Sequence, residues 1–266
     1  MTSMTTNPEE TLVLRQDEAG VATLTLNRPK QYNALSQAML GALQAALDAV
    51  AADKTIRVVV IAGNGPAFCA GHDLREMRAS SDPAFHRALF TQCGQVMLTI
   101  NRLPQPVIAR VQGIATAAGC QLVAACDLAV ASTNARFATS GINVGLFCFT
   151  PGVALSRNLS RKHALELLLT GDFIDAATAL QRGLINRVTP PEQLDATIRQ
   201  LADSICNKSS LAIGMGKELF YRQLGMELEH AYACASDAMV CNLNSEDARE
   251  GIDAFLAKRK PEWKGR

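Results

Sequence analysis

The sequence predicts an α/β fold with a largely parallel sheet, followed by a helical C-terminal region. Short apolar runs rich in β-branched residues, such as Val107–Val111, alternate with helical patterns up to about residue 190. Strands that alternate with helices indicate parallel pairing, because each helix carries the chain back to the start of the next strand. From Pro191 onward the pattern is helical. We therefore expect a β/α core over residues 1–190 and a helical region over residues 191–266.

The first part of the chain predicts a hairpin, a strand and two helices. Alternating apolar and polar residues at 12–16 and 21–26 predict a β-hairpin around the turn at 17–20. Ser36 is a candidate N-cap for an amphipathic helix that ends near Val50 and carries one apolar stripe. The further elements expected here are a buried strand at 57–62, a loop at 67–74 and a long helix at 82–101, which the prolines at 104 and 106 stop.

The central stretch, residues 106–127, combines a buried strand with a run of small residues. After the strand Val107–Val111, the segment 115–119 reads ATAAG, and an apolar helix follows at 122–126. Backbone N–H groups at a helix start have no partner inside the helix and carry partial positive charge, so they can hold a carbonyl oxygen that gains negative charge. Small residues also let a helix pack closely on its strand, and by itself this segment favours that structural role.

The rest of the chain continues the alternation and then becomes helical. We expect strands at 128–132 and 136–139, helices at 155–158, 163–169 and 176–181, and a last strand after the turn at 183–185. Helices are expected near 192–206, 211–222, 226–243 and 246–258.

Composition excludes several classes of protein. The chain has 266 residues, of which 48% are hydrophobic and 19% charged, with a net charge of +1. It is therefore globular, and the lack of a basic or acidic block argues against nucleic acid or a membrane as partner and for a small molecule. No apolar stretch is long enough to span a membrane, and the polar first ten residues, with Glu9 and Glu10, match neither a secretory signal nor an Arg-rich transit peptide. We expect a cytoplasmic protein.

Cysteines, histidines and glycines show no familiar metal, redox or phosphate pattern. The eight cysteines include no CxxC pair and several lie in apolar runs, so we expect them to be core residues in a reducing compartment. The four histidines are scattered, so no metal site is expected. The glycine clusters at 63–65 and 214–216 lack the spacing of dinucleotide and phosphate loops, and no GxSxG turn is present.

The strongest signal is a pair of loops, each directly after a predicted strand. One reads FCAGHDL at 68–74, and the other reads AAGCQ at 117–121. Together with LNRP at 26–29, NAL at 33–35, LTG at 169–171 and GL at 183–184, they resemble the crotonase superfamily, also called the enoyl-CoA hydratase/isomerase family. The resemblance extends from about residue 12 to Trp263, and the sequences at 143–148 and 150–155 resemble one subgroup of that family.

This resemblance implies a fold, an assembly and a ligand. The fold is the ClpP/crotonase-like β-β-α superhelix, with a C-terminal helical region that mediates trimerisation. Members of the family usually form trimers or pairs of trimers, so a homotrimer or a hexamer is expected. The implied ligand is an acyl-CoA thioester, with no cofactor beyond the CoA moiety of that ligand.

The resemblance also assigns site residues. In the family, two backbone N–H groups bind the thioester carbonyl oxygen and stabilise the enolate-like charge that forms on it, and these map onto His72 and Ala118. The side chain of His72 is not expected to take part. The residues expected to hold the CoA carrier are Lys30, Gln31, Tyr32 and Ala70, with Phe255 and Lys258, which in the family often reach the carrier in a neighbouring subunit.

Two positions depart from the family pattern. Hydratases of the family use two glutamates to position water and shuttle its proton, and here these positions hold Gln121 and Gly141. Neither replacement exchanges protons near neutral pH, and Gly141 is expected to leave room for a bulkier acyl group. Three functions stay open: a hydratase or isomerase with another base, a decarboxylase of malonyl-type CoA esters that needs only the oxyanion hole, and a non-catalytic acyl-CoA-binding protein. The candidate replacement bases are Asp73, Glu76 and His86.

Overall fold

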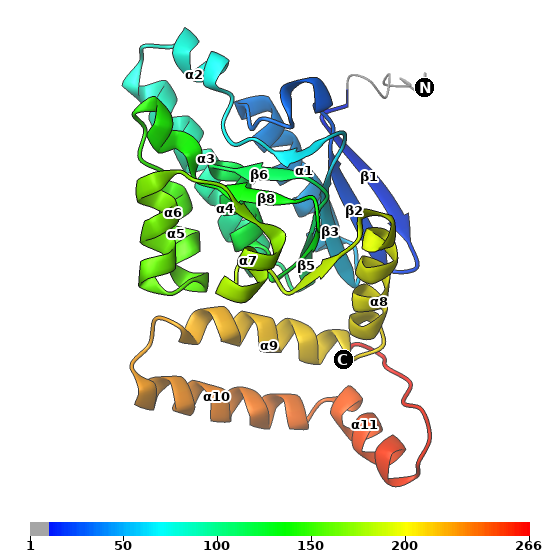
Figure 1. Ribbon diagram of the computed structural model, residues 1–266. Coiled ribbons are helices and arrows are strands. Elements are labelled where there is room, and N and C mark those ends of the chain that lie inside the picture. Colours follow the sequence, from blue (N-terminus) through cyan, green and yellow to red (C-terminus); the bar gives the residue numbers. More distant parts are fainter. Residues whose placement is uncertain (1–10) are drawn as a thin grey trace, which may run out of the picture.

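The computed structural model describes residues 11–266, which form two β-sheets surrounded by helices (Figure 1). A six-stranded sheet has the order β1-β2-β3-β5-β7-β10, and a four-stranded sheet has the order β4-β6-β8-β9. The strands of the larger sheet are β1 Val13–Glu18, β2 Val21–Leu26, β3 Val58–Gly63, β5 Val107–Val111, β7 Leu128–Ser132 and β10 Arg187–Thr189. Those of the smaller sheet are β4 Ala67–Cys69, β6 Ile114–Thr116, β8 Arg136–Ala138 and β9 Ile174–Asp175. The first ten residues, on which the expected lack of a targeting segment rests, lie outside the described residues.

The helices cover the sheets and then extend beyond them. Those before residue 190 are α1 Gln37–Ala52, α2 Leu74–Ala79, α3 Pro83–Arg102, α4 Ala118–Ala125, α5 Phe149–Asn158, α6 Arg161–Thr170 and α7 Ala176–Arg182. The last four are α8 Leu194–Cys206, α9 Ser210–Gln223, α10 Leu228–Leu243 and α11 Glu246–Leu256, and the short 3-10 helices are η1 Pro29–Gln31, η2 Ser140–Val144 and η3 Pro191–Gln193. Within residues 11–266, none of these helices combines the length and the apolarity that crossing a membrane requires.

The larger sheet confirms the predicted α/β pattern. β1 and β2 pair antiparallel with Val13 opposite Leu26, as the predicted hairpin requires. β2, β3, β5, β7 and β10 then pair in parallel. The sequence does not predict the short strands β4, β6 and β9, and β4 lies in the expected loop at 67–74. Strands of two or three residues are too short for a period-2 pattern, so their neighbours in the sheet define them.

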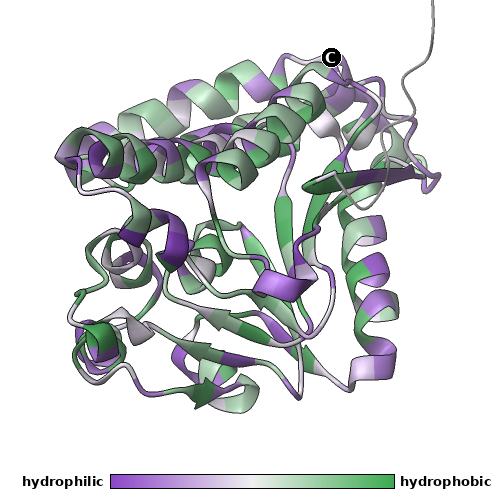
Figure 2. Cartoon of the chain, turned by 90° about the horizontal axis from the view of Figure 1, so that it is seen from above, coloured by the Kyte–Doolittle hydropathy of each residue, from purple (hydrophilic) through white to green (hydrophobic). Residues whose placement is uncertain are grey.

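The main core lies between the larger sheet and the helices packed on it, among them α1 and α3. Ser36 caps α1 as predicted, because its hydroxyl accepts a hydrogen bond from the Met39 N–H at 3.1 Å. The predicted stripe of α1 is fully buried, and its members are Met39, Leu40, Leu43, Leu47 and Val50. Figure 2 shows hydrophobic residues along the strands and a mixture of hydrophobic and hydrophilic residues on the surrounding helices, as a layered α/β core requires.

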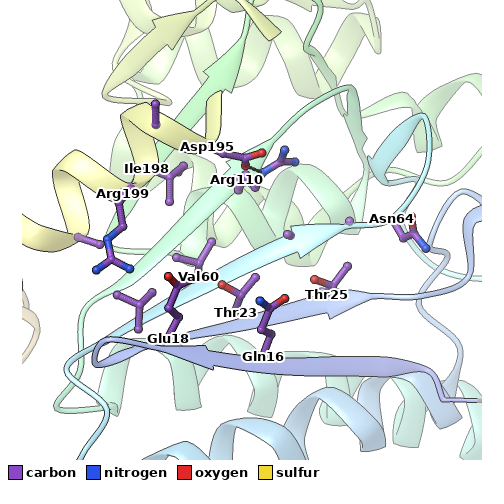
Figure 3. A pocket seen from close by; sticks show the side chains of 15 residues that line it. Gln16, Glu18, Thr23, Thr25, Val60, Asn64, Arg110, Asp195, Ile198 and Arg199 are labelled. Carbon is purple, nitrogen blue, oxygen red and sulfur yellow. Dashed lines mark hydrogen bonds and ion pairs between the residues drawn. The ribbon is translucent and has the colours of Figure 1, made fainter. Parts of the chain in front are cut away.

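Helix α8 packs on the opposite face of the larger sheet. Ile198 of α8 joins Val58 and Val60 in a second apolar cluster, whereas Val59 and Ile61 face the main core. Beside α8 this sheet face forms an open depression of about 710 Å³ with polar walls (Figure 3).

The arginines of this depression are already paired. Arg110 pairs with Asp195, and Arg199 pairs with Asp203 one turn along the same helix. Neither of these two arginines is therefore available as an unpaired cation for an anionic ligand in the depression.

A buried polar cluster anchors α9 to the core. The Lys217 ammonium donates hydrogen bonds to the carbonyl oxygens of Ile100 at 2.8 Å and Gln105 at 2.9 Å and to the Asp127 carboxylate at 2.6 Å. Tyr221 donates its hydroxyl to the other oxygen of Asp127 at 2.7 Å. Burial lowers the pKa of Lys217, and the Asp127 carboxylate opposes that shift. The Lys217 side chain is only 7% exposed, so these contacts form away from water.

The final residues fold back onto α9 and α11. The Asp247 carboxylate, whose residue is 1% exposed, accepts hydrogen bonds from the Ser209 hydroxyl at 2.6 Å and from the N–H groups of Lys264 at 2.7 Å and Gly265 at 3.0 Å. Trp263 donates its ring N–H to the Asn207 carbonyl at 2.8 Å. Burial raises the pKa of Asp247, but the hydrogen bonds together outweigh burial and hold it below its usual value.

Asp247→Asn is expected to remove part of the acid sensitivity of the fold. A carboxyl whose folded pKa is depressed contributes stability that is fully present above its unfolded pKa, about 3.9, and lost as pH falls through the folded pKa. In the variant, an uncharged amide replaces the carboxylate that accepts from three donors, so we expect the free energy of unfolding to fall by about 1–3 kcal/mol at pH 7. Urea unfolding at pH 7, 4 and 3 should show that the difference in unfolding free energy between the variant and wild type becomes smaller as the pH falls. Asp172→Asn, at an exposed carboxylate, is the matched control, and an unchanged difference across this pH range would refute the assignment.

Candidate functional site

The two loops singled out in the sequence touch each other. They follow β4 and β6, which are parallel neighbours, so both loops leave the same edge of the smaller sheet. A Cβ added at Gly71 would lie 2.8 Å from the Ala117 Cβ and 3.1 Å from the Ala118 nitrogen. A Cβ added at Gly119 would lie 2.0 Å from the Cys69 carbonyl oxygen. Only glycine permits this approach of the two backbones.

Two backbone donors are left without a partner at this contact. In the described part of the chain, no group accepts a hydrogen bond from the N–H of His72 or of Ala118. Ala118 is the first residue of α4, so its N–H also carries the partial charge of a helix start. Ala117 before it has a φ of 50°, a strained value for a residue with a side chain, and such strain concentrates at ligand sites. The arrangement can therefore hold an oxygen that gains negative charge.

The His72 ring lies in an apolar environment. It packs edge-on against Phe90 of α3, with ring centroids 5.3 Å apart. Burial lowers its pKa, and the Leu35 carbonyl, which lies near the ring but outside hydrogen-bonding geometry, offsets part of that shift. Both ring nitrogens are buried without a hydrogen-bond partner in residues 11–266. The ring is thus neutral at pH 7.

The positions of the two missing glutamates are both crowded. Gln121 on α4 is 4% exposed, and its side-chain oxygen has no partner among the described residues. At Gly141 in η2, an added Cβ would lie 2.6 Å from the Leu146 carbonyl oxygen and 2.9 Å from the Cys148 sulfur. The space that a side chain at position 141 would enter is therefore filled, which argues against the expectation that Gly141 leaves room for a larger acyl group. The chain turns back after η2, with the Leu146 N–H bonded to the Gly141 carbonyl at 3.0 Å, and fills that space.

The three candidate replacement bases are engaged elsewhere. The Asp73 carboxylate caps α2 and pairs with Arg28 at 3.2 Å. Burial raises the pKa of Asp73, but the α2 N–H groups and Arg28 outweigh it and hold the pKa low, which makes Asp73 a poor base at neutral pH. Glu76 accepts a hydrogen bond from the Gln37 N–H at 3.0 Å. His86 uses one ring nitrogen on the Met77 carbonyl at 3.1 Å.

Sequence reasoning missed a hydroxyl pair beside the site. The side chains of Thr116 and Ser140 lie 2.8 Å apart and join the end of β6 to the start of η2. Thr116 directly precedes Ala117, the residue with positive φ before α4. Ser140 directly precedes Gly141, one of the two positions that hold a glutamate in the family's hydratases. Their positions next to these residues were the available signal, but hydroxyls are too common in loops to single them out.

The residues expected to hold the CoA carrier fall into two groups. Lys30, Gln31 and Tyr32 form an exposed turn, and the Tyr32 carbonyl accepts a hydrogen bond from the Ala70 N–H at 2.9 Å. This turn therefore adjoins the loop that contains His72. The other group, Phe255 and Lys258, lies at the end of α11, and Figure 1 places α11 at the opposite end of the molecule from α2. One chain alone does not bring the two groups together.

The cysteines supply no nucleophile at the site. Five are buried, as predicted, and these are Cys69, Cys93, Cys120, Cys126 and Cys148. Burial raises the pKa of Cys69 and of Cys120 to about 12, so both thiols stay protonated near neutral pH. Cys241 on α10 is exposed, which the core prediction did not anticipate. Over residues 11–266, no group of three or more potential ligands could hold a metal ion.

Comparisons with known proteins extend these observations. A family model described as enoyl-CoA hydratase/isomerase matches residues 16–266. The mitochondrial enoyl-CoA hydratase domain-containing protein 3 of Mus musculus is 46% identical over 255 residues, which are 96% of this chain and 85% of the mouse protein. The crystal structure of the human protein of that name has a TM-score of 0.93 and 46% identity, over 95% of this chain and 100% of that chain.

A solved structure with a hydratase name is also similar. The crystal structure of an enoyl-CoA hydratase from Mycobacterium smegmatis has a TM-score of 0.94 and 58% identity, over 96% of this chain and 99% of that chain. These similarities confirm the fold that the loop motifs predicted and the subgroup that residues 143–155 resemble.

Proposed function

The chain belongs to the enoyl-CoA hydratase/isomerase family, and we propose that it binds acyl-CoA thioesters where its two loops meet. The thioester carbonyl oxygen accepts hydrogen bonds from the backbone N–H groups of His72 and Ala118. The observation that carries this proposal is the pair of unpartnered donors held at the contact of Gly71 with Ala118. Donors fixed before the ligand arrives stabilise a developing enolate by about 3 kcal/mol each.

The proposed chemistry needs no carboxylate base. Gln121 and Gly141 have no side-chain group that acts as an acid or base near neutral pH, and Asp73 has a depressed pKa, so water activation by paired carboxylates is not part of this proposal. Decarboxylation of a malonyl-type CoA ester fits such a site. The bond between the α-carbon and its carboxylate breaks, CO₂ leaves, and the electron pair forms the thioester enolate. The enolate then takes a proton from water at the α-carbon.

The complete site is proposed to need a second subunit. Lys30, Gln31, Tyr32 and Ala70 hold the carrier from one chain, and Phe255 and Lys258 come from a neighbour in a homotrimer or hexamer. Phe255 is 81% exposed, so it is free to reach another chain. Large apolar side chains are exposed along α10 and α11, as a subunit contact requires, and they include Leu228, Tyr232, Met239, Val240, Phe255 and Leu256.

The test combines titration with mass spectrometry in D₂O. Purified protein is titrated with butyryl-CoA, then incubated with enoyl-, saturated and malonyl-type CoA esters. We expect binding, together with CO₂ loss and deuterium uptake for the malonyl type. Lys30→Ala should weaken binding several-fold, whereas Lys162→Ala, at an exposed lysine of α6, should not. Binding without any mass change would favour a non-catalytic binding protein. Failure of every CoA ester to bind would refute the proposal.

A further inference from the structure

We propose that Arg28 is a positioning residue that fixes the direction of the His72 backbone N–H and couples it to the turn expected to hold the CoA carrier. This inference rests on the proposed function, since it concerns one of the two donors to the thioester oxygen. Arg28 itself touches neither donor nor ligand, and its contribution is transmitted through Asp73 and Leu35.

The backbone on both sides of His72 is held by one buried residue. The Leu35 N–H donates to the Gly71 carbonyl at 2.8 Å, and the Leu35 carbonyl accepts from the Asp73 N–H at 3.2 Å. Leu35 is fully buried in the main core. The His72 N–H lies between these two bonds and has no acceptor among residues 11–266, so its direction depends on how firmly Leu35 and Asp73 are held.

The planar guanidinium group of Arg28 binds both the backbone next to Leu35 and the side chain of Asp73. One guanidinium nitrogen donates to the Ala34 carbonyl at 3.2 Å, directly before Leu35, and the other donates to the Asp73 carboxylate at 3.2 Å. The side chains of this ion pair are 22% and 14% exposed, so water screens it only in part. A rigid fork fixes the separation of its two acceptors, which a lysine ammonium does not.

The backbone of Arg28 belongs to the carrier turn. Its carbonyl accepts hydrogen bonds from the N–H groups of Gln31 and Asn33, each at 3.0 Å, and its N–H donates to the Asn33 side chain at 2.9 Å. Asn33 is fully buried and donates to the carbonyls of Asn64, Ala67 and Phe68. A ligand that orders this turn therefore also orders the Arg28 side chain and, through it, the donor. Binding energy from the carrier is thus available at the reacting carbonyl.

The experiment measures how strongly the bound enolate is favoured, separately from carrier binding. Acetoacetyl-CoA loses an α-proton to give an enolate with its own ultraviolet band, and donors at the thioester oxygen lower its apparent pKa. Arg28→Lys should raise that pKa by about one unit, which corresponds to about tenfold weaker enolate binding. Its affinity for butyryl-CoA should change less than threefold. Asp73→Asn keeps a residue that can cap α2 and should shift the pKa in the same direction.

The control and the outcomes separate this inference from the proposed function. Arg15→Lys is the matched control, because Arg15 also holds two acceptors, Asp17 and Asp53, but on the hairpin edge. It should leave both readouts unchanged. If acetoacetyl-CoA has the same apparent pKa on both Arg28→Lys and Asp73→Asn as on wild type, Arg28 has only a structural role. The same conclusion follows if both variants lose butyryl-CoA affinity by as large a factor as they lose enolate binding. If wild type binds no CoA ester, the proposed function fails. If it binds butyryl-CoA but leaves the acetoacetyl-CoA pKa unchanged, CoA-ester binding stands, but enolate stabilisation by the two donors fails and the positioning role of Arg28 fails with it.

Discussion

Lys217→Met is expected to lower the free energy of unfolding by about 3–5 kcal/mol, because it breaks a buried ion pair and leaves its partner charged. The ammonium of Lys217 serves three acceptors at once, and none of them gains a new donor in the variant. Asp127 keeps the Tyr221 hydroxyl and the Val107 N–H, at 2.7 Å each, but loses its counter-ion. Urea unfolding at pH 7 measures the loss as a lower midpoint.

The control for this variant is an exposed ion pair on a neighbouring helix. Arg199→Met breaks the pair with Asp203, whose side chains are 40% and 46% exposed, and such pairs contribute about 0.5 kcal/mol. Hydrogen exchange should also become faster in α9 of Lys217→Met, since α9 loses its deepest polar contact with the core. Equal urea midpoints for the two variants would mean that apolar packing alone holds α9.

Gly119→Ala is expected to force the two loops apart. The new Cβ would lie 2.0 Å from the Cys69 carbonyl oxygen and 2.7 Å from its carbon, and backbone atoms cannot move away by changing a rotamer. We expect a loss of about 3 kcal/mol in unfolding free energy, at the upper end of overpacking costs. Affinity for butyryl-CoA should fall at least about tenfold, because a displacement of about 1 Å disturbs the geometry between Ala118 and His72.

A glycine in open space provides the control for this change. Gly216 lies inside α9 with nothing within 4 Å of an added Cβ. Gly216→Ala should therefore stabilise the protein by about 0.5–1 kcal/mol through its helix preference. Thermal unfolding of both variants beside wild type separates the two cases. A Gly119→Ala variant as stable as wild type and with full affinity would show that the loop contact is not required.

The regular elements were predictable from sequence because their signals are local. The stripe of α1 and the Ser36 cap lie within one segment of chain, and periodicity finds them. The family resemblance singled out His72 and Ala118 in two loops, and the structure brings those loops into contact. That these two N–H groups bind a thioester stays a prediction.

What sequence could not reveal depends on contacts between distant or folded-back segments. Gly141 is crowded because Leu146 turns back over it, and no local pattern encodes that approach. The bond between Arg28 and Asp73 joins residues 45 positions apart. Strands β4 and β6 likewise are defined by their pairing, β4 with β6 and β6 with β8, since three residues carry no recognisable period.

The two unpartnered donors belong to the main chain, and this has a consequence for how such a protein diverges. Every amino acid except proline supplies a backbone N–H, so point mutations can exchange the His72 or Ala118 side chain without deleting either donor. Acidic side chains have no such protection, because one codon change removes them. A lineage can therefore lose its proton-transfer groups by drift and still inherit a cradle for a negatively charged oxygen, on which selection can later establish a different reaction.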